Sequence, residues 1–153
     1  MGGCIIDRIK NRTERPTESY LAASFETFIR ALQTVHDRGY IHRDLKLENV
    51  MAITKEESSP MKVIDFGHMV SLSRRGSVLV QPNYLCGTDG YFAPESLLRC
   101  EYSAKTDVWQ AGCILYTMLA GHPVSRMTYV GPLHATYGEG GGAGGFGGRG
   151  VCL

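Results

Sequence analysis

The stretch His42-Arg43-Asp44-Leu45-Lys46-Leu47-Glu48-Asn49 decides the fold of this 153-residue chain. Its polar residues lie between two strand-like apolar runs, so the stretch is predicted to be a loop. Asp44 is suited to accept the proton of an attacking hydroxyl group, and the side-chain carbonyl of Asn49 is suited to bind Mg²⁺. Lys46 lies between them and can reach a phosphoryl oxygen as negative charge develops there. The spacing predicts that these side chains converge on one site.

A second acidic motif, Asp65-Phe66-Gly67, follows twenty-one residues after Asp44. It comes directly after an apolar run, which would place it at the end of a strand. A hard carboxylate oxygen at Asp65 suits Mg²⁺. We expect Gly67 to let the backbone turn sharply after the motif.

Two helices are predicted from apolar residues at spacings of three and four. The first covers about 18–38, with Thr17 as its N-cap and Gly39 as its stop. The second covers 104–120, with Ser103 as its N-cap.

Two strand-like runs, 49–53 and 61–64, lie between these helices. The polar residues that join them predict a β-hairpin. A long connection follows over 67–83, rich in Ser, Arg and Gly. A loop of this length within a compact domain indicates a functional segment or a disordered one.

Residues 42–49 resemble the catalytic loop of protein kinases, and Asp65-Phe66-Gly67 resembles their metal-binding motif. Ala93-Pro94-Glu95 resembles the end of the kinase activation segment. Asp107-Val108-Trp109, with Gly112, resembles the long buried helix that follows it. Four motifs in this order, one of them eight residues long, form a specific signature.

The resemblance also indicates which kind of protein kinase the sequence is similar to. Lys46 and Cys86-Gly87-Thr88 are similar to the serine/threonine pattern, whereas tyrosine kinases usually differ there. Residues 2–9 resemble the segment after the hinge in calcium/calmodulin-dependent and plant-type calcium-dependent kinases. The resemblance covers about 2–124, as a partial kinase domain. It implies the mainly helical (α+β) large lobe of a kinase, with a small β-hairpin that bears the metal site.

The resemblance implies a role for each matched residue. Asp44 would be the catalytic base, and Lys46 would steady the transferred phosphoryl group. Thr88 would lie beside Asp44 and help to hold the substrate hydroxyl. Asn49 and Asp65 would bind Mg²⁺, and Lys46 with these two would contact the ATP cofactor. The expected reaction is phosphoryl transfer from ATP to Ser and Thr hydroxyls of protein substrates.

A regulatory site is also predicted. Arg43 would pair with a phosphate on the activation segment. The sequence Arg74-Arg75-Gly76-Ser77-Val78 is a target for kinases that prefer basic residues, so we expect Ser77 to be phosphorylated and bound by Arg43. The alternative is a solvated basic loop. Tyr84 occupies the position where many related kinases carry the activating threonine.

The single tryptophan and four of the histidines are predicted to have structural roles. Trp109 is predicted to be a core aromatic residue. His36, His68, His122 and His134 show no ligand spacing and are predicted to be surface or packing residues.

Composition limits the remaining classes of function. The formal net charge of +1 does not favour a nucleic-acid partner. Five scattered cysteines form neither a zinc pattern nor a disulfide framework, and indicate free thiols in a reducing compartment. The most apolar stretch, 111–121, is about half the ~20 residues of a membrane-spanning helix. We therefore expect a cytoplasmic, or nuclear, protein without a membrane span.

Both ends are expected to be truncated relative to a complete kinase domain. The sequence starts after the hinge, and nine of the thirteen residues of 138–150 are glycine, so 125–153 is predicted to be a disordered tail. Without the small lobe, the chain alone would be inactive or nearly so. Its exposed apolar surface would favour association. The alternative function is a truncated, non-catalytic protein that binds kinase partners or substrates.

Overall fold

The computed structural model describes residues 5, 17–54, 59–74, 76–122 and 124. Its longest helix, α2, spans Glu18–Asp37, as predicted. The Thr17 hydroxyl accepts a hydrogen bond from the Tyr20 backbone N–H and caps the first turn. Gly39 follows the helix with a φ of 78°, a left-handed conformation that glycine adopts without strain.

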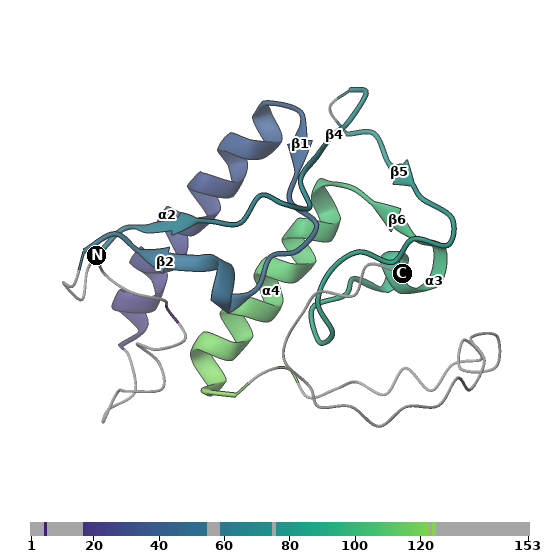
Figure 1. The fold of residues 1–153 in the computed structure, drawn as a ribbon. Helices are drawn as coiled ribbons and strands as arrows, with labels where there is room; N and C mark the ends of the chain where they lie inside the picture. The colour runs from purple at the N-terminus through teal and green to yellow at the C-terminus, as the bar shows by residue number, and fades with distance from the viewer. Residues whose placement is uncertain (1–4, 6–16, 55–58, 75, 123, 125–153) are drawn as a thin grey trace.

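The second long helix, α4, spans Ala104–Ala120, which confirms the predicted bounds. It begins with a capping box, in which the side chains of Ser103 and Thr106 each bond to the backbone of the other. It ends at Gly121, which has a φ of 76°. Helices α2 and α4 contact each other and form the main layer of the fold (Figure 1).

The predicted hairpin is present. Strand β2 (Val50–Ala52) pairs antiparallel with β3 (Met61–Val63), and Val50 lies opposite Val63. A short 3₁₀ helix, η1 (Leu47–Asn49), leads into β2. Strand β3 contacts α2, so the hairpin closes one side of the helical layer.

The long connection contains more regular structure than predicted. Strand β4 (Val70–Ser71) pairs with β1 (Tyr40–Ile41), and β5 (Leu79–Val80) pairs with β6 (Glu101–Tyr102). Helix α3 (Pro94–Arg99) lies just before β6. The part of the chain that the structure describes therefore has three two-stranded antiparallel sheets, where the sequence predicted one hairpin. Two-residue strands are too short to produce an alternating pattern, which is why the sequence did not reveal them.

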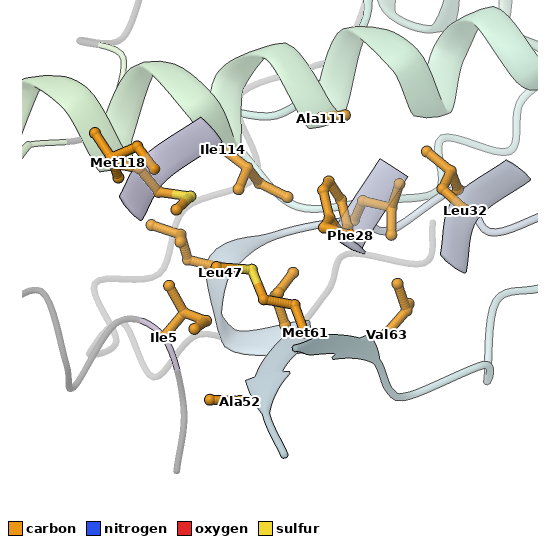
Figure 2. Close-up of a cluster of buried hydrophobic side chains, with 13 residues drawn as sticks. Ile5, Phe28, Leu32, Leu47, Ala52, Met61, Val63, Ala111, Ile114 and Met118 are labelled. Atoms are coloured by element: carbon orange, nitrogen blue, oxygen red, sulfur yellow. The ribbon is translucent and has the colours of Figure 1, made fainter. Parts of the chain in front are cut away.

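One apolar core joins α2, α4 and the hairpin. In Figure 2, Phe28 and Leu32 of α2, Ile114 and Met118 of α4, and Met61 of β3 point toward a common centre. Burial of these side chains supplies most of the drive for folding, at about 25 cal/mol per Å² of apolar surface. Leu45 and Leu47 belong to the same core and anchor both sides of Lys46. A smaller cluster joins Ile41 of β1, Tyr102 of β6 and Cys86.

The opposite face of α4 is exposed. Trp109 is 43% exposed, so its prediction as a core aromatic residue was wrong. Val108, Tyr116 and Leu119 are also exposed on this helix. Apolar residues occur on all sides of α4, and the sequence alone did not show which of them α2 and the hairpin would cover.

The remaining predictions concern membrane spans, the cysteines and the C-terminal tail. None of the described helices is both long and apolar enough to cross a bilayer. Cys86, Cys100 and Cys113 are free thiols. The proposed tail, 125–153, lies outside the described residues, as do Cys4, Cys152 and His134.

Candidate active site

The backbone of the catalytic loop is held by a buried carboxylate from α4. Asp107 is fully buried, and its two oxygens accept hydrogen bonds from the backbone N–H groups of His42 and Arg43, each at 2.8 Å. Arg43 has a φ of 70°, a left-handed conformation that costs a non-glycine residue about 1 to 3 kcal/mol. The loop keeps this conformation because α4 satisfies its polar groups.

His36 also bonds to this carboxylate. Its Nε2 lies 2.7 Å from Asp107 Oδ2, and its side chain is only 16% exposed. The interpretation of His36 as a surface or packing residue missed this contact, because its partner lies 71 positions later in the sequence. Through Asp107, His36 links α2 to the catalytic loop.

His42 is a buried residue of the loop. Asp44 N–H donates to its Nδ1 at 3.4 Å, and its Nε2 lies 3.3 Å from the Ile64 carbonyl oxygen. These two contacts together require the neutral ring with the proton on Nε2. Burial lowers the pKa of His42, although the Asp107 carboxylate acts in the opposite direction.

The predicted catalytic side chains come together. The Thr88 hydroxyl donates to Asp44 Oδ1 at 2.6 Å, and Lys46 Nζ donates to Thr88 Oγ1 at 3.0 Å. Lys46 Nζ also lies 3.3 Å from Asp44 Oδ2. Asp44 is 3% exposed, so its carboxylate is oriented by these two neighbours. A carboxylate fixed beside a hydroxyl and an ammonium group can accept a proton while the ammonium stabilises nearby negative charge.

Thr88 is positioned by the two residues before it. Gly87 has a φ of 134°, and a Cβ there would lie 3.0 Å from the Phe92 ring and 3.2 Å from the Arg43 carbonyl oxygen. Cys86 N–H donates to the buried hydroxyl of Tyr102 at 2.7 Å. The side chains of Cys86 and His68 also meet, with His68 Nδ1 2.9 Å from the Cys86 sulfur. Glycine is therefore required at 87 for Thr88 to approach the loop this closely.

The two predicted metal ligands lie at neighbouring backbone positions. Ile64 N–H donates to the Asn49 carbonyl at 2.9 Å, and Asp65 follows directly. The Asn49 side-chain nitrogen donates to the Asp44 carbonyl at 2.9 Å, so the amide oxygen is the atom that could bind a cation. One amide oxygen and one exposed carboxylate suit Mg²⁺, which takes few protein oxygens and completes its shell with phosphates and water.

The backbone turns at Gly67 and His68, as expected after the metal-binding motif. Met69 N–H donates to the Phe66 carbonyl at 3.1 Å and closes this turn. The left-handed residue of the motif is Asp65, with a φ of 61°. Gly67 also contacts the Asp65 carboxylate. Its N–H donates to Asp65 Oδ1 at 3.3 Å, and an added Cβ would lie 3.3 Å from the same oxygen.

Comparison with known proteins identifies the family. The family model described as a protein kinase domain matches residues 1–131. The chain belongs to the protein kinase family. It is 43% identical over 122 residues to calcium-dependent protein kinase 7 of Arabidopsis thaliana, which covers 80% of this chain and 22% of that protein. It is 37% identical over 120 residues to human calcium/calmodulin-dependent protein kinase type IV, covering 78% of this chain and 24% of that protein. The chain therefore spans about a quarter or less of these relatives, and the predicted resemblance is confirmed.

The arginine of the kinase catalytic loop already has partners. Arg43 Nε donates to the His68 carbonyl at 2.7 Å, and Nη1 donates to Gln81 Oε1. The guanidinium carbon lies 5.5 Å from the centre of the Tyr102 ring and 5.9 Å from that of Tyr84. The side chain is thus engaged by the segment that follows the metal-binding motif.

Ser77 lies elsewhere on that segment. It is half-buried, and its hydroxyl donates to the Arg74 carbonyl at 2.7 Å within a tight turn. The contacts in the described part of the chain do not join Ser77 to Arg43, so their pairing stays a prediction.

The sequence interpretation missed Gln110, a buried polar residue of α4. Leu45 N–H donates to its Oε1 at 2.9 Å, and its Nε2 donates to the Arg43 carbonyl at 2.8 Å. A signal was available, since Gln110 lies one helical turn after Asp107 and therefore on the same face.

Proposed function

We propose that this chain carries the catalytic centre of a serine/threonine protein kinase, which transfers a phosphoryl group from ATP to Ser and Thr hydroxyls of proteins. The observation that carries the proposal is the closed contact of Asp44, Thr88 and Lys46, at 2.6, 3.0 and 3.3 Å. We infer further that the described fold corresponds to the large lobe of a kinase. The family match and the two long helices around the catalytic loop support this assignment.

In the proposed reaction, Asp44 accepts the proton of the substrate hydroxyl. Thr88 donates to one oxygen of Asp44 and so directs the other oxygen, with Lys46 beside it. Lys46 neutralises charge that develops on the transferred group. The low exposure of Asp44 restricts access of competing water.

Asn49 and Asp65 would hold Mg²⁺, since they offer the oxygen donors that this ion prefers. Bound Mg²⁺ would neutralise the phosphate oxygens of ATP. The chain's own contribution is to orient both donors: Asp44 fixes the Asn49 amide, and the Gly67 N–H fixes the Asp65 carboxylate.

The test uses two forms of the protein. The 153-residue chain is assayed for transfer of labelled phosphate to a serine-containing peptide. A chimera, in which this segment replaces the equivalent part of calcium-dependent protein kinase 7, is assayed in parallel. We expect Asp44→Asn to lower the chimera's rate by at least about a hundredfold. A well-folded chimera without activity, or an Asp44→Asn variant with full activity, would contradict the proposal.

We propose in addition that phosphorylation of Ser77 regulates this site. The support is the sequence itself, with arginines three and two residues before the serine. A phosphate there would have to draw Arg43 away from Gln81. Treatment of the chain with a kinase that prefers basic residues should label wild type and not Ser77→Ala. Equal labelling of the two proteins would exclude this residue.

A second candidate function is non-catalytic binding of kinase partners or substrates. The exposed side chains of Val108, Trp109 and Leu119 favour it, because a soluble domain seldom leaves several large apolar residues on one helix uncovered. Sedimentation of the chain should then show association that weakens in Trp109→Ser. A monomer at all concentrations would leave this candidate without support.

A further inference from the structure

Gln110 has an unusual position for a polar side chain of a helix. It is 1% exposed, and both ends of its amide bond to the catalytic loop, on either side of Asp44. Oε1 accepts from Leu45 N–H at 2.9 Å, and Nε2 donates to the Arg43 carbonyl at 2.8 Å. An N–H group requires the oxygen and a carbonyl requires the nitrogen, so the two partners fix the orientation of the amide. We call this pair of bonds the Gln110 bridge.

The bridge completes the hydrogen bonding of the two peptide groups that flank Asp44. The N–H of Asp44 itself donates to His42 Nδ1, and its carbonyl accepts from Asn49 Nδ2. The other two polar atoms of these peptide groups are the ones that Gln110 binds. Neither peptide group can rotate without breaking a bond to a buried side chain, so the Asp44 Cα–Cβ direction is fixed.

The bridge also acts on the left-handed residue before Asp44. The N–H of Arg43 is held by Asp107 and its carbonyl by Gln110, two side chains on one face of α4. The same carbonyl lies against Gly87, the residue that brings Thr88 to the catalytic base. Displacement of this carbonyl would therefore disturb both partners of the contact between Asp44 and Thr88.

We propose that Gln110 is a positioning residue for Asp44, which sets the direction of its carboxylate through the two flanking peptide groups. This inference rests on the proposed function for its catalytic consequence. Its structural part, the bridge, can be measured without catalysis.

The test is amide hydrogen exchange of Leu45, followed by NMR on the full chain. Gln110→Met has a similar volume and cannot form either bond, so Leu45 should exchange about tenfold faster, the change expected when a buried N–H loses its partner. Thr117→Val is the matched control, because Thr117 is a buried polar residue of α4 whose hydroxyl bonds to the Cys113 carbonyl of the same helix. Its Leu45 exchange should equal that of wild type.

Gln110→Glu separates the two bonds. A carboxylate still accepts from Leu45 N–H, so Leu45 should stay protected, but it cannot donate to the Arg43 carbonyl. If Gln110→Met does not fold, hydrogen exchange of the Gln110 side-chain amide in wild type shows whether the bridge is present. Slow exchange of that amide supports the bridge, and exchange at the rate of a free amide overturns it.

Catalysis supplies the second measurement, in the active chimera. We expect Gln110→Met to lower kcat about tenfold with the KM for Mg²⁺-ATP unchanged, whereas a purely structural defect would move both constants or would appear in Thr117→Val as well. Unchanged Leu45 exchange and unchanged kcat in Gln110→Met would overturn the proposal. If Leu45 exchanges faster in Gln110→Met but the chimera with the wild-type segment shows no phosphotransfer, the result counts against the proposed function and leaves the bridge intact.

Discussion

Removal of the Asp107 carboxylate should destabilise the whole fold as well as the site. Asp107 accepts three hydrogen bonds, from the backbones of His42 and Arg43 and from the ring of His36, at 2.7 to 2.8 Å. Asp107→Ala leaves two buried backbone N–H groups without a partner. Asp107→Asn has the same shape but retains a single acceptor atom.

The magnitude follows from these contacts. A buried donor without a partner costs about 1 to 3 kcal/mol, so two such donors and the lost His36 bond predict about 3 to 5 kcal/mol for Asp107→Ala. Asp107→Asn should cost about half as much. A domain of this size is stabilised by only about 5 to 15 kcal/mol, so the alanine variant should be close to unfolding at room temperature.

Urea denaturation, followed by circular dichroism, measures these differences. Glu26→Ala is the control, because Glu26 forms an exposed ion pair with Arg30 on the surface of α2 and should cost about 0.5 kcal/mol or less. A loss below about 1 kcal/mol for Asp107→Ala would refute the reasoning, since it would mean that water or a shifted loop satisfies the two N–H groups.

Three further predictions concern other contacts of the site. Thr88→Val should lower phosphotransfer in the chimera about tenfold because Asp44, the proposed base, loses its hydroxyl partner, while Thr88→Ser should retain most of the rate; equal rates for both would contradict this role. Because burial lowers the pKa of His42 below its ordinary 6.5, the unfolded chain takes up a proton first, so stability is present above pH 6.5 and is lost as the pH falls below it. The free energy of unfolding, measured from denaturation curves between pH 7 and pH 5, should therefore change less with pH in His42→Phe than in wild type. An unchanged dependence on pH would count against a neutral ring. Tyr102→Phe should cost about 1 to 3 kcal/mol because the Cys86 N–H loses its partner, whereas the half-exposed Tyr116→Phe should be nearly neutral by thermal denaturation.

Local signals explain what the sequence predicted well. The bounds of α4 follow from Ser103 and Gly121, whose preferences act within one helical turn. The contact between Asp44 and Thr88 was inferred from family resemblance, and the geometry agrees with it. Residue types and short spacings are sufficient for the helix ends, because each end is decided by its immediate neighbours in the chain.

Features that depend on distant partners were not predictable in the same way. His36 has no local pattern that points to Asp107. The spacing of Gln110 from Asp107 indicates a shared helix face but does not identify Leu45 as the partner, since each contact spans more than sixty residues. The exposure of Trp109 was missed for a related reason: helix periodicity identifies apolar positions but not which of them another element will cover.

The large sequence separation of these contacts has a consequence for folding during synthesis. Asp107 and Gln110 each bond to loop residues 65 positions earlier. At a synthesis rate of about 5 to 20 residues per second, the catalytic loop waits roughly 3 to 13 s on the ribosome before α4 is made. During that interval the left-handed turn at Arg43 has no support from α4, so a nascent chain can complete α2 well before it can complete an active site.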